Sequence, residues 1–467
     1  MPPRFRLHPL SLSRMRHHLP FSAVLVFAAA RLVAAVDFTS LDQLARAELA
    51  RTGIPGCAVA VVVDGKLAHA QGYGVANVDT GEPVRADMLF RLGSTTKMFT
   101  AATVVSLARD GRLKLDAPIG NVVSGLAPKI ARVTPHQLLS HSAGLGDDAP
   151  MDGPHDDSAL AAAGRALSDQ LVFAEPAKIY SYSNPGFWLA GLTAEVAGGK
   201  PYADLVNERV LAPCGMVRST FRPTLAMTWP LAVGHAGENG KKANVIRPLA
   251  DNAATWPAGQ LFSSAPEFAR FCIALMSSGQ LDGRTVLAPE LVTALTTPHV
   301  AVADGESHYG YGVAVRTEAG LRWWSHSGSR AGYGSVARMC PDRGLAVIIL
   351  CNRTGEHLPR VADKAAALVL GTPPPPRPAA KALPLTDTDR ARLVGTFTNG
   401  QTTVVIREKD GQPVGAQGGT WSKLGANRYQ RSASGNTPAT EFIFSAGLDG
   451  QGAYLTQGGR ALRRTKP

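Results

Sequence analysis

A run of prolines divides this chain. Residues 372–378 read Thr-Pro-Pro-Pro-Pro-Arg-Pro, and successive prolines are excluded from helix interiors and from central strands. Such a run forms a stiff, extended spacer. We therefore expect a first folded part at 36–371, a proline-rich linker at 372–380 and a second folded part at 381–467. The 467 residues, 45% of them hydrophobic, are enough to build both cores.

The net charge of +12 lies at the two ends of the chain. Residues 1–35 hold five arginines and no acid, residues 373–467 hold 13 basic and 6 acidic side chains, and residues 36–372 hold 30 of each. A basic surplus spread over a whole chain favours a nucleic-acid partner. Because the large middle of this chain is neutral, we expect no nucleic-acid partner, and we expect any acidic partner to bind the C-terminal part.

The first 35 residues have the three-part order of a secretory signal peptide. A basic stretch runs to Arg16, an apolar run covers 21–30, and the small residues Val33-Ala34-Ala35 follow. Cleavage after Ala35 fits this order best, and Ala30 also satisfies the small-residue rule. The apolar run is too short to span a bilayer. We expect a cleavable signal peptide at 1–35, a secreted or periplasmic protein and no membrane span.

The five cysteines are few, scattered and odd in number, which does not predict a disulfide framework. They are Cys57, Cys214, Cys272, Cys340 and Cys351. A turn at 341–344 pairs Cys340 with Leu345, which places Cys351 too far along the strand for a disulfide to Cys340. No Cys/His spacing is typical of a zinc site. We expect no metal and no cofactor.

The order of predicted elements indicates an α+β fold for residues 36–371. Asp64-Gly65 between the apolar runs 57–63 and 66–73 is a strong hairpin signal. We expect an antiparallel sheet built from both ends of this part, flanked by helices and interrupted by an all-helical insert. Helical patterns cover 94–107, 134–140, 158–171, 185–196, 202–210, 265–276, 289–296 and 356–370, and strand patterns cover 311–316, 321–325, 334–339 and 345–351.

Beyond the prolines, short alternating runs predict a small all-β barrel or sandwich. These runs cover residues 393–397, 402–407, 441–444 and 453–457, and glycine and asparagine separate them.

Ser94 and Lys97 form an S-x-x-K motif at the start of a helical pattern. Residues i and i+3 share a helix face, so the Lys97 amine lies near the Ser94 hydroxyl. A serine becomes a nucleophile when a neighbour takes its proton, and a desolvated lysine of lowered pKa is such a neighbour. The helix N-terminus adds the N–H of Ser94 for a developing oxyanion. Taken alone, this spacing also fits a capping serine with a solvated lysine.

Two further motifs follow in order along the chain. The first, Y-x-N at 182–184, precedes an apolar helix and by itself predicts a turn with a capping asparagine. The second, H-x-G at 326–328, follows the strand 321–325 and by itself predicts a polar hairpin turn. Together, the three motifs resemble the signatures of the serine hydrolases of the β-lactamase and penicillin-binding-protein superfamily. The resemblance covers residues 38–370 and includes the segments 138–145, 257–261, 309–312 and 347–352.

This resemblance implies a role for each motif residue. Ser94 is the acylated nucleophile, and Lys97 accepts its proton. Tyr182 carries a proton to the leaving group and later activates water, while Asn184 holds the substrate amide and the Lys97 side chain. The N–H groups of Ser94 and Ser329 form the oxyanion hole.

The third motif departs from that of class C β-lactamases. His326 stands where those enzymes have lysine, and is similar to the D-alanyl-D-alanine carboxypeptidases, D-aminopeptidases and esterases of the superfamily. The charge that binds a β-lactam carboxylate is therefore weak near neutral pH. His326, Ser327, Gly328 and Ser329 are expected to bind substrate. Arg330 either supplies a replacement cation or is solvated.

The C-terminal part is similar to the lipocalin-like barrel appended to some peptidases of this superfamily. The match rests on Leu-Val-Gly-Thr-Phe at 393–397 and Glu-Phe-Ile-Phe at 441–444. In those relatives the barrel packs near the active site or mediates self-assembly. The resemblance implies a limit on substrate length, or a homo-oligomer formed through the barrel.

The chain is thus predicted to be an exported serine hydrolase that acts through an acyl-enzyme on small esters or D-amino-acid-containing peptides, with weak β-lactam turnover. Two alternatives stay open: a class C-type β-lactamase, and a non-catalytic penicillin-recognition protein whose basic barrel binds an anionic surface polymer. An α/β-hydrolase is excluded because G-x-S-x-G is absent. Nucleotide binding is unsupported because G-x-G-x-x-G and Walker A motifs are absent.

Overall fold

The computed structural model describes Met1 and residues 36–465, except 238–241, 304, 373–381, 417 and 436. The expected signal peptide, apart from Met1, and the proline run from residue 373 lie outside the described residues. Residues 37–467 form one compact unit, which includes the C-terminal barrel.

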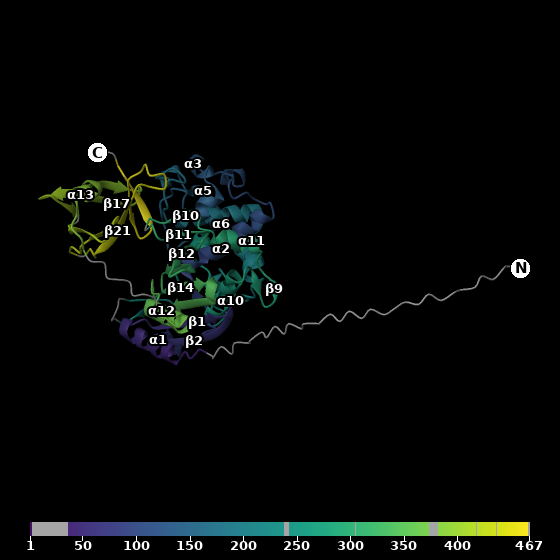
Figure 1. Ribbon diagram of the computed structural model, residues 1–467. Helices are drawn as coiled ribbons and strands as arrows, with labels where there is room; N and C mark the ends of the chain where they lie inside the picture. The colour runs from purple at the N-terminus through teal and green to yellow at the C-terminus, as the bar shows by residue number, and fades with distance from the viewer. Residues whose placement is uncertain are drawn as a thin grey trace. The chain divides into compact units, whose positions relative to one another are not determined.

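A nine-stranded antiparallel sheet organises the first part of this unit, and β1, β2 and β14 are labelled in Figure 1. The strand order is β10-β11-β12-β13-β14-β15-β1-β2-β3, so strands from the start of the chain lie beside strands from residues after 300. The predicted α+β sheet built from both ends is confirmed. Its strands are β1 (Gly56–Val63), β2 (Lys66–Asn77), β3 (Glu82–Pro83), β10 (Val300–Ala301), β11 (His308–Tyr309), β12 (Ala314–Glu318), β13 (Leu321–Arg330), β14 (Tyr333–Cys340) and β15 (Leu345–Cys351).

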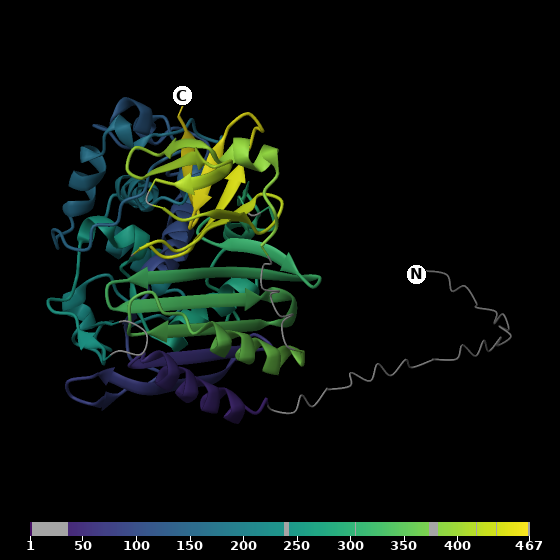
Figure 2. The ribbon, with the colours of Figure 1, turned by 90° about the vertical axis from the view of Figure 1, so that its left-hand side faces the viewer.

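Alternate side chains of the central strands enter two separate cores, because successive residues of a strand point to opposite faces. Val59 and Val61 of β1 face α1 (Thr39–Thr52) and α12 (Pro359–Leu370), which lie on one face of the sheet in Figure 2. Ala58 and Ala60 face the larger, helical core on the other side. A strand buried on both faces needs the continuous apolar run that this sequence has at 57–63.

The helical region confirms most of the predicted helices. The helices at 265–276 and 289–296 match residue for residue, whereas the one predicted at 94–107 begins with a single 3₁₀ turn, η1 (Gly93–Thr96). The helices of this region are α2 (Lys97–Arg109), α3 (Pro128–Ala131), α4 (Pro135–Leu139), α5 (Ala159–Ala166), α6 (Asn184–Gly198), α7 (Tyr202–Val206), α8 (Pro223–Ala226), α9 (Trp256–Gly259), α10 (Ala265–Met276) and α11 (Pro289–Thr296). Short strand pairs join β4 (Phe90–Arg91) to β7 (Phe262–Ser263), β5 (His235–Ala236) to β6 (Asn244–Val245), and β8 (Gln280–Leu281) to β9 (Arg284–Thr285).

The strand predicted to end at Ser325 continues to Arg330, so the H-x-G motif lies on β13 and not in a hairpin turn. The prediction of a turn is wrong because the polar residues at 326–330 continue the strand. Pairing with β14 holds them in the sheet, with Ser327 opposite Val336 and Ser329 opposite Gly334. The side of β13 away from β14 pairs with β12 only as far as Ser325, which leaves the motif on an edge without a partner strand among the described residues.

The C-terminal part is a nearly closed, eight-stranded antiparallel barrel, as predicted. The strand order is β18-β17-β16-β23-β22-β21-β20-β19, and a bridge joins Val414 of β18 to Thr420, the residue before β19. The elements are α13 (Asp387–Leu393), β16 (Gly395–Thr398), β17 (Thr403–Lys409), β18 (Gln412–Gly415), β19 (Trp421–Lys423), β20 (Arg428–Arg431), β21 (Thr440–Ser445), β22 (Tyr454–Gln457) and β23 (Arg460–Arg464). A small apolar core fills the barrel, with Phe397, Trp421, Tyr429, Phe442 and Leu455 among its members.

Candidate active site

Ser94 lies in the 3₁₀ turn between β4 and α2, close to β13. Gly93 has a left-handed φ of +56°, and a Cβ added there would lie 2.6 Å from the backbone nitrogen of Ser329. A Cβ added to Gly328 would lie 2.0 Å from the Leu92 oxygen and 2.9 Å from the Ser94 nitrogen. Glycine at both positions therefore lets β13 pass directly beside the turn that carries Ser94. The two N–H groups predicted to form the oxyanion hole are brought to the same place.

Lys97 is the first residue of α2, and its side chain is completely buried. Its Nζ donates to Asn184 Oδ1 at 2.6 Å and to the Ala258 oxygen at 2.7 Å, and lies 3.4 Å from Ser94 Oγ. Burial lowers the pKa of Lys97 well below its usual value. A neutral amine has two N–H donors and one lone pair. With both donors bound to Asn184 and Ala258, the lone pair is directed to Ser94.

Tyr182 lies two residues before α6, and its hydroxyl is close enough to the Ser94 side chain for Ser94 to lower its pKa. Its ring centroid lies 4.7 Å from Lys97 Nζ. Burial raises the pKa of Tyr182, and Ser94 only partly offsets this effect. The hydroxyl is therefore neutral at physiological pH, which suits a proton donor to a leaving group.

Asn184 opens α6, and Asp147 fixes its orientation. Asp147 Oδ1 accepts hydrogen bonds from the Asn184 backbone N–H at 2.6 Å and from Nδ2 at 2.9 Å. The amide oxygen of Asn184 is then left to face Lys97. The expected contact between Asn184 and the lysine is thus present in the structure.

His326 points to the same cluster from β13. Its Nε2 lies 2.9 Å from the Tyr309 hydroxyl, and its Nδ1 lies 2.6 Å from the Ser327 oxygen. Burial and the nearby Lys97 lower the pKa of His326 to about 3. His326 is therefore uncharged near neutral pH and provides no fixed cation.

The remaining predicted residues of β13 separate into two groups. Ser327 is exposed and alternates with His326 and Gly328, so its side chain points to the other face of the strand. Arg330 is 5% exposed and donates to the backbone oxygens of Pro150 and Met151. Of the two alternatives for Arg330, the solvated side chain is wrong, because Pro150 and Met151 of the loop 145–157 bind and cover it. The positive charge of Arg330 still lowers the pKa of Lys97, after the larger effect of burial.

A cavity of about 850 Å³ opens beside these side chains. Of the motif residues, Tyr182, His326 and Ser327 line this cavity, and Ser94 and Lys97 are not among its lining residues. Other lining residues are Tyr180, Tyr309, Arg316, Glu318, Arg338, His357 and Asp363. Because it is lined by aromatic rings and by charges of both signs, this cavity is suited to a polar substrate with an apolar side chain.

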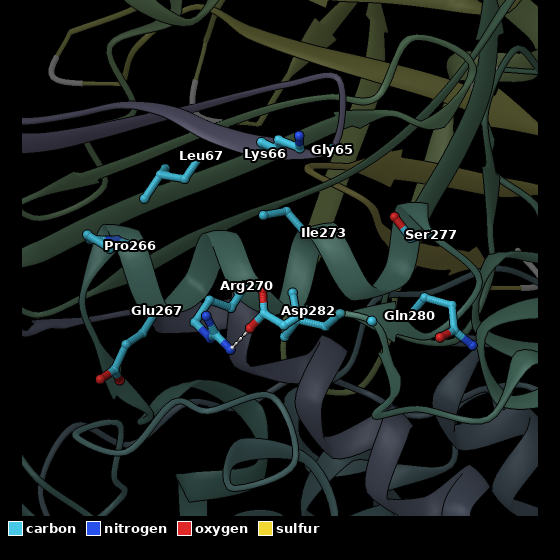
Figure 3. Close-up of a pocket in the computed structure, with 12 residues that line it drawn as sticks. Gly65, Lys66, Leu67, Pro266, Glu267, Arg270, Ile273, Ser277, Gln280 and Asp282 are labelled. Carbon is cyan, nitrogen blue, oxygen red and sulfur yellow. Dashed lines mark hydrogen bonds and ion pairs between the residues drawn. The ribbon is translucent and has the colours of Figure 1, made fainter.

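A separate cavity of about 600 Å³ lies along α10, between the β1–β2 turn and the β8–β9 hairpin (Figure 3). Arg270 and Asp282 form an ion pair of 2.6 Å there. It is lined by none of the motif residues. Of these two cavities, the one beside Tyr182 is therefore the one that motif residues border.

Three residues of the site were not predicted. His141 is buried and packs its ring 4.3 Å from that of Tyr182, Asp147 binds Asn184, and Arg460 of the barrel pairs with Asp147 at 2.5 Å. His141 lies in the segment 138–145 that carries part of the family resemblance, so a signal for it existed. Arg460 follows two glycines in an ordinary turn, and only the packing of the barrel reveals it.

The structure brings the three motifs close together, and comparison with known proteins decides the family. The family model described as Beta-lactamase matches residues 41–372. The chain belongs to the beta-lactamase family.

Relatives in this family include penicillin-binding proteins and peptidases. Penicillin-binding protein 4 of Amycolatopsis lactamdurans is 31% identical over 64% of this chain and 81% of its own length. D-aminopeptidase of Gluconobacter oxydans is 28% identical over 67% of this chain, which spans 58% of that protein. The chain is therefore a serine hydrolase of the penicillin-binding and D-aminopeptidase type.

Among solved structures, SurE is similar over nearly the whole length. It is 25% identical, with a TM-score of 0.73 and coverage of 91% of this chain and 98% of SurE. SurE has also been solved with D-Leu. The similarity includes the barrel as well as the hydrolase fold.

Residues 36–465, with the gaps given above, contain no helix that is long and apolar enough to cross a membrane. The same residues contain no group of three or more His, Cys, Asp and Glu side chains arranged to hold a metal ion.

Proposed function

We propose that this protein is an exported serine hydrolase that forms an acyl-enzyme at Ser94 and acts on small esters or on peptides that contain a D-amino acid. The observation that carries the proposal is the Lys97 amine, which is buried, has a lowered pKa and lies 3.4 Å from Ser94 Oγ. A general base in this position contributes about 10²–10⁴-fold to the rate.

In the proposed reaction, Ser94 Oγ attacks the substrate carbonyl carbon while its proton passes to Lys97 Nζ. The carbonyl oxygen becomes an oxyanion that accepts hydrogen bonds from the N–H groups of Ser94 and Ser329, each worth about 3–4 kcal/mol of barrier. Tyr182 then gives its hydroxyl proton to the departing oxygen or nitrogen, and the proton on Lys97 restores it. A water molecule then attacks the acyl carbon and gives a proton to Lys97 through Tyr182; the bond from this carbon to Ser94 Oγ breaks, the proton returns to Oγ, and the acid leaves.

The D-amino-acid part of the proposal rests on the relatives. D-aminopeptidase is a relative by sequence, and SurE, which has been solved with D-Leu, is a relative by structure. A neutral His326 further supports a substrate other than a β-lactam, because recognition of a β-lactam carboxylate requires a cation. We expect slow β-lactam turnover for the same reason.

The test is hydrolysis of matched chromogenic substrates by the wild type and by Ser94→Ala. We expect p-nitrophenyl acetate to be cleaved, and the p-nitroanilide of D-alanine to be cleaved faster than that of L-alanine. Ser94→Ala should cleave none of them above background. Preference for the L-alanine substrate would contradict the D-amino-acid assignment, and activity of Ser94→Ala would contradict the nucleophile.

A second candidate is a protein that binds penicillin covalently and releases it slowly. The 31% identical relative is named a penicillin-binding protein, which favours this candidate. A fluorescent penicillin should label the wild type and leave Ser94→Ala unlabelled. A label that persists for hours supports this second candidate, and prompt release supports the class C-type β-lactamase.

Export, the domain boundaries, self-association through the barrel and binding of an anionic polymer by the barrel stay predictions. Retention of the protein on an anionic matrix, with strong salt dependence, would support binding of an anionic polymer by the barrel. Sedimentation of the purified protein would reveal self-association.

A further inference from the structure

The turn between β22 and β23 of the barrel reaches the active site. The Tyr182 N–H donates to the Gly459 oxygen at 2.9 Å, and the Ala461 N–H donates to Ser181 Oγ at 3.2 Å. These bonds lie on either side of Arg460, so they fix its position along the segment that carries Tyr182. The guanidinium carbon of Arg460 lies 5.0 Å from the centroid of the Tyr182 ring, within the range of a cation–π interaction.

A continuous chain of polar contacts runs from Arg460 to the catalytic lysine. Arg460 Nε donates to Asp147 Oδ2 at 2.5 Å, Asn184 Nδ2 donates to Asp147 Oδ1 at 2.9 Å, and Lys97 Nζ donates to Asn184 Oδ1 at 2.6 Å. The side chain of Asp147 is 12% exposed and that of Arg460 is 43% exposed. An amide that donates its N–H₂ to a carboxylate must turn its oxygen the other way. Asp147 therefore sets the side of Asn184 that Lys97 meets.

We propose that Arg460 and Asp147 are positioning residues for Lys97, through which the barrel sets the geometry and the charge state of the general base. This inference rests on the proposed function. Arg460 holds the Asp147 carboxylate, the carboxylate orients Asn184, and Asn184 holds the amine beside Ser94. Neither Arg460 nor Asp147 exchanges a proton with substrate in this arrangement.

The charges around Lys97 make this relay, the chain of contacts Arg460–Asp147–Asn184–Lys97, measurable through the pKa of Lys97. Burial has the largest effect on the pKa of Lys97 and lowers it, Asp147 raises it, and Arg460 and Arg330 lower it. The other titratable groups near Lys97 are all uncharged at neutral pH, because burial lowers the pKa of His141 and of His326 and raises that of Tyr182. In the wild type, Asp147 and Arg460 act on the pKa of Lys97 in opposite directions. If either partner is removed, the effect of the remaining charge on the pKa of Lys97 is no longer opposed.

The two single variants must therefore shift the pKa of Lys97 in opposite directions. Arg460→Gln removes a positive charge and leaves Asp147 unpaired, which raises the pKa of Lys97. Asp147→Asn keeps an oxygen that accepts from the Asn184 amide and leaves Arg460 unpaired, which lowers the pKa of Lys97. Because Arg460 is partly exposed, we expect each shift to be about half a pH unit. A residue with a purely structural role would not produce shifts of opposite sign.

The experiment measures the second-order rate constant for labelling of Ser94 by a fluorophosphonate between pH 5 and 10, with p-nitrophenyl acetate kinetics beside it. The rate should rise with pH as Lys97 loses its proton. We expect this rise to move to higher pH in Arg460→Gln and to lower pH in Asp147→Asn. Arg460→Lys, which keeps the charge, should restore the wild-type profile. For the small ester, kcat should fall in Arg460→Gln while KM stays unchanged.

The matched control is Arg463→Gln, which removes the same charge from an exposed position on the same strand. Its profile should coincide with that of the wild type, and far-UV circular dichroism should show that all variants fold. Shifts in the same direction, or profiles like that of Arg463→Gln, would overturn the relay while the wild type still labels at Ser94. Absence of label on the wild type would instead overturn the proposed function, and this inference with it.

Discussion

The site chemistry depends on one lysine that the fold keeps out of water. Lys97 is completely buried, and its two closest contacts are acceptors, so the amine is both desolvated and oriented. Lys97→Met keeps the volume and removes the lone pair. We expect it to lower the fluorophosphonate labelling rate about 10²–10⁴-fold with little loss of stability. A labelling rate within threefold of the wild type would show that another group takes the proton of Ser94.

His326 makes a prediction about stability and pH. Its pKa is about 3 in the folded protein and 6.5 in the unfolded chain, so between these values the unfolded chain binds more protons. The free energy of unfolding should therefore fall as the pH is lowered from 6.5 towards 3, by about 1.4 kcal/mol per pH unit from this group. His326→Gln should reduce that slope, as measured by urea unfolding at pH 7, 6 and 5. Equal slopes for the variant and the wild type would show that His326 titrates normally.

At this scale the sequence identified Ser94, Lys97, Tyr182, Asn184 and His326, and the structure brings all five together. These residues could be predicted because each belongs to a motif of three or four consecutive residues. Asp147 and Arg460 were missed, since their role depends on a contact between residues more than 300 positions apart. The environment of Arg330 was also missed, because a loop that the motif does not include covers it.

The close approach of β13 to the turn at Ser94 is the element-level feature on which the oxyanion hole depends. Gly328→Ala tests this approach, because the added Cβ would lie 2.0 Å from the Leu92 oxygen. The strand must move away, which separates the N–H of Ser329 from that of Ser94. We expect kcat for p-nitrophenyl acetate to fall at least 10²-fold. Gly425→Ala is the control, since its Cβ would meet nothing closer than Arg428 Cβ at 3.8 Å. Unchanged kcat in Gly328→Ala would exclude this oxyanion hole.

Helices and turns, which depend on a local sequence pattern, were predicted well. The length and the partners of strands depend on pairing with distant segments and were predicted less well. The helix 265–276 follows from its apolar period, and the turn at Pro341–Gly344 correctly pairs Cys340 with Leu345. The length of β13 was underestimated, because its polar end is held by β14. The pairing of β1 with β15 places Cys57 opposite Cys351, a contact that local periodicity does not reveal. All five cysteines are free and buried.

Over the whole molecule, the barrel and the hydrolase fold share a small core. Tyr454 and Ala461 of the barrel pack against Ala174 and Ile179, and Asp449 pairs with Lys178 at 2.9 Å. The basic surplus found in the sequence thus belongs to a part of the chain that also contacts the active site. The composition showed which part of the chain carries the basic surplus, but only the structure shows that Arg460 forms an ion pair with Asp147.

This shared core predicts that damage inside the barrel reduces activity. Asp389 is buried and accepts hydrogen bonds from Tyr429 at 2.7 Å and from Lys423 at 2.9 Å. Asp389→Asn should destabilise the barrel by about 2–3 kcal/mol, since it leaves Lys423 unpaired. We expect thermal unfolding and loss of esterase activity to shift to lower temperature together. Activity that survives melting of the barrel would show that the two parts act independently.

The central claim is that Ser94 is the nucleophile and that its acylation depends on Lys97. Intact-mass spectrometry after incubation with a fluorophosphonate tests it most directly, followed by peptide mapping of the labelled residue. We expect one adduct per chain on Ser94 in the wild type, none in Ser94→Ala, and strongly slowed labelling in Lys97→Met. An adduct on any other residue, or an adduct that persists in Ser94→Ala, would contradict the claim.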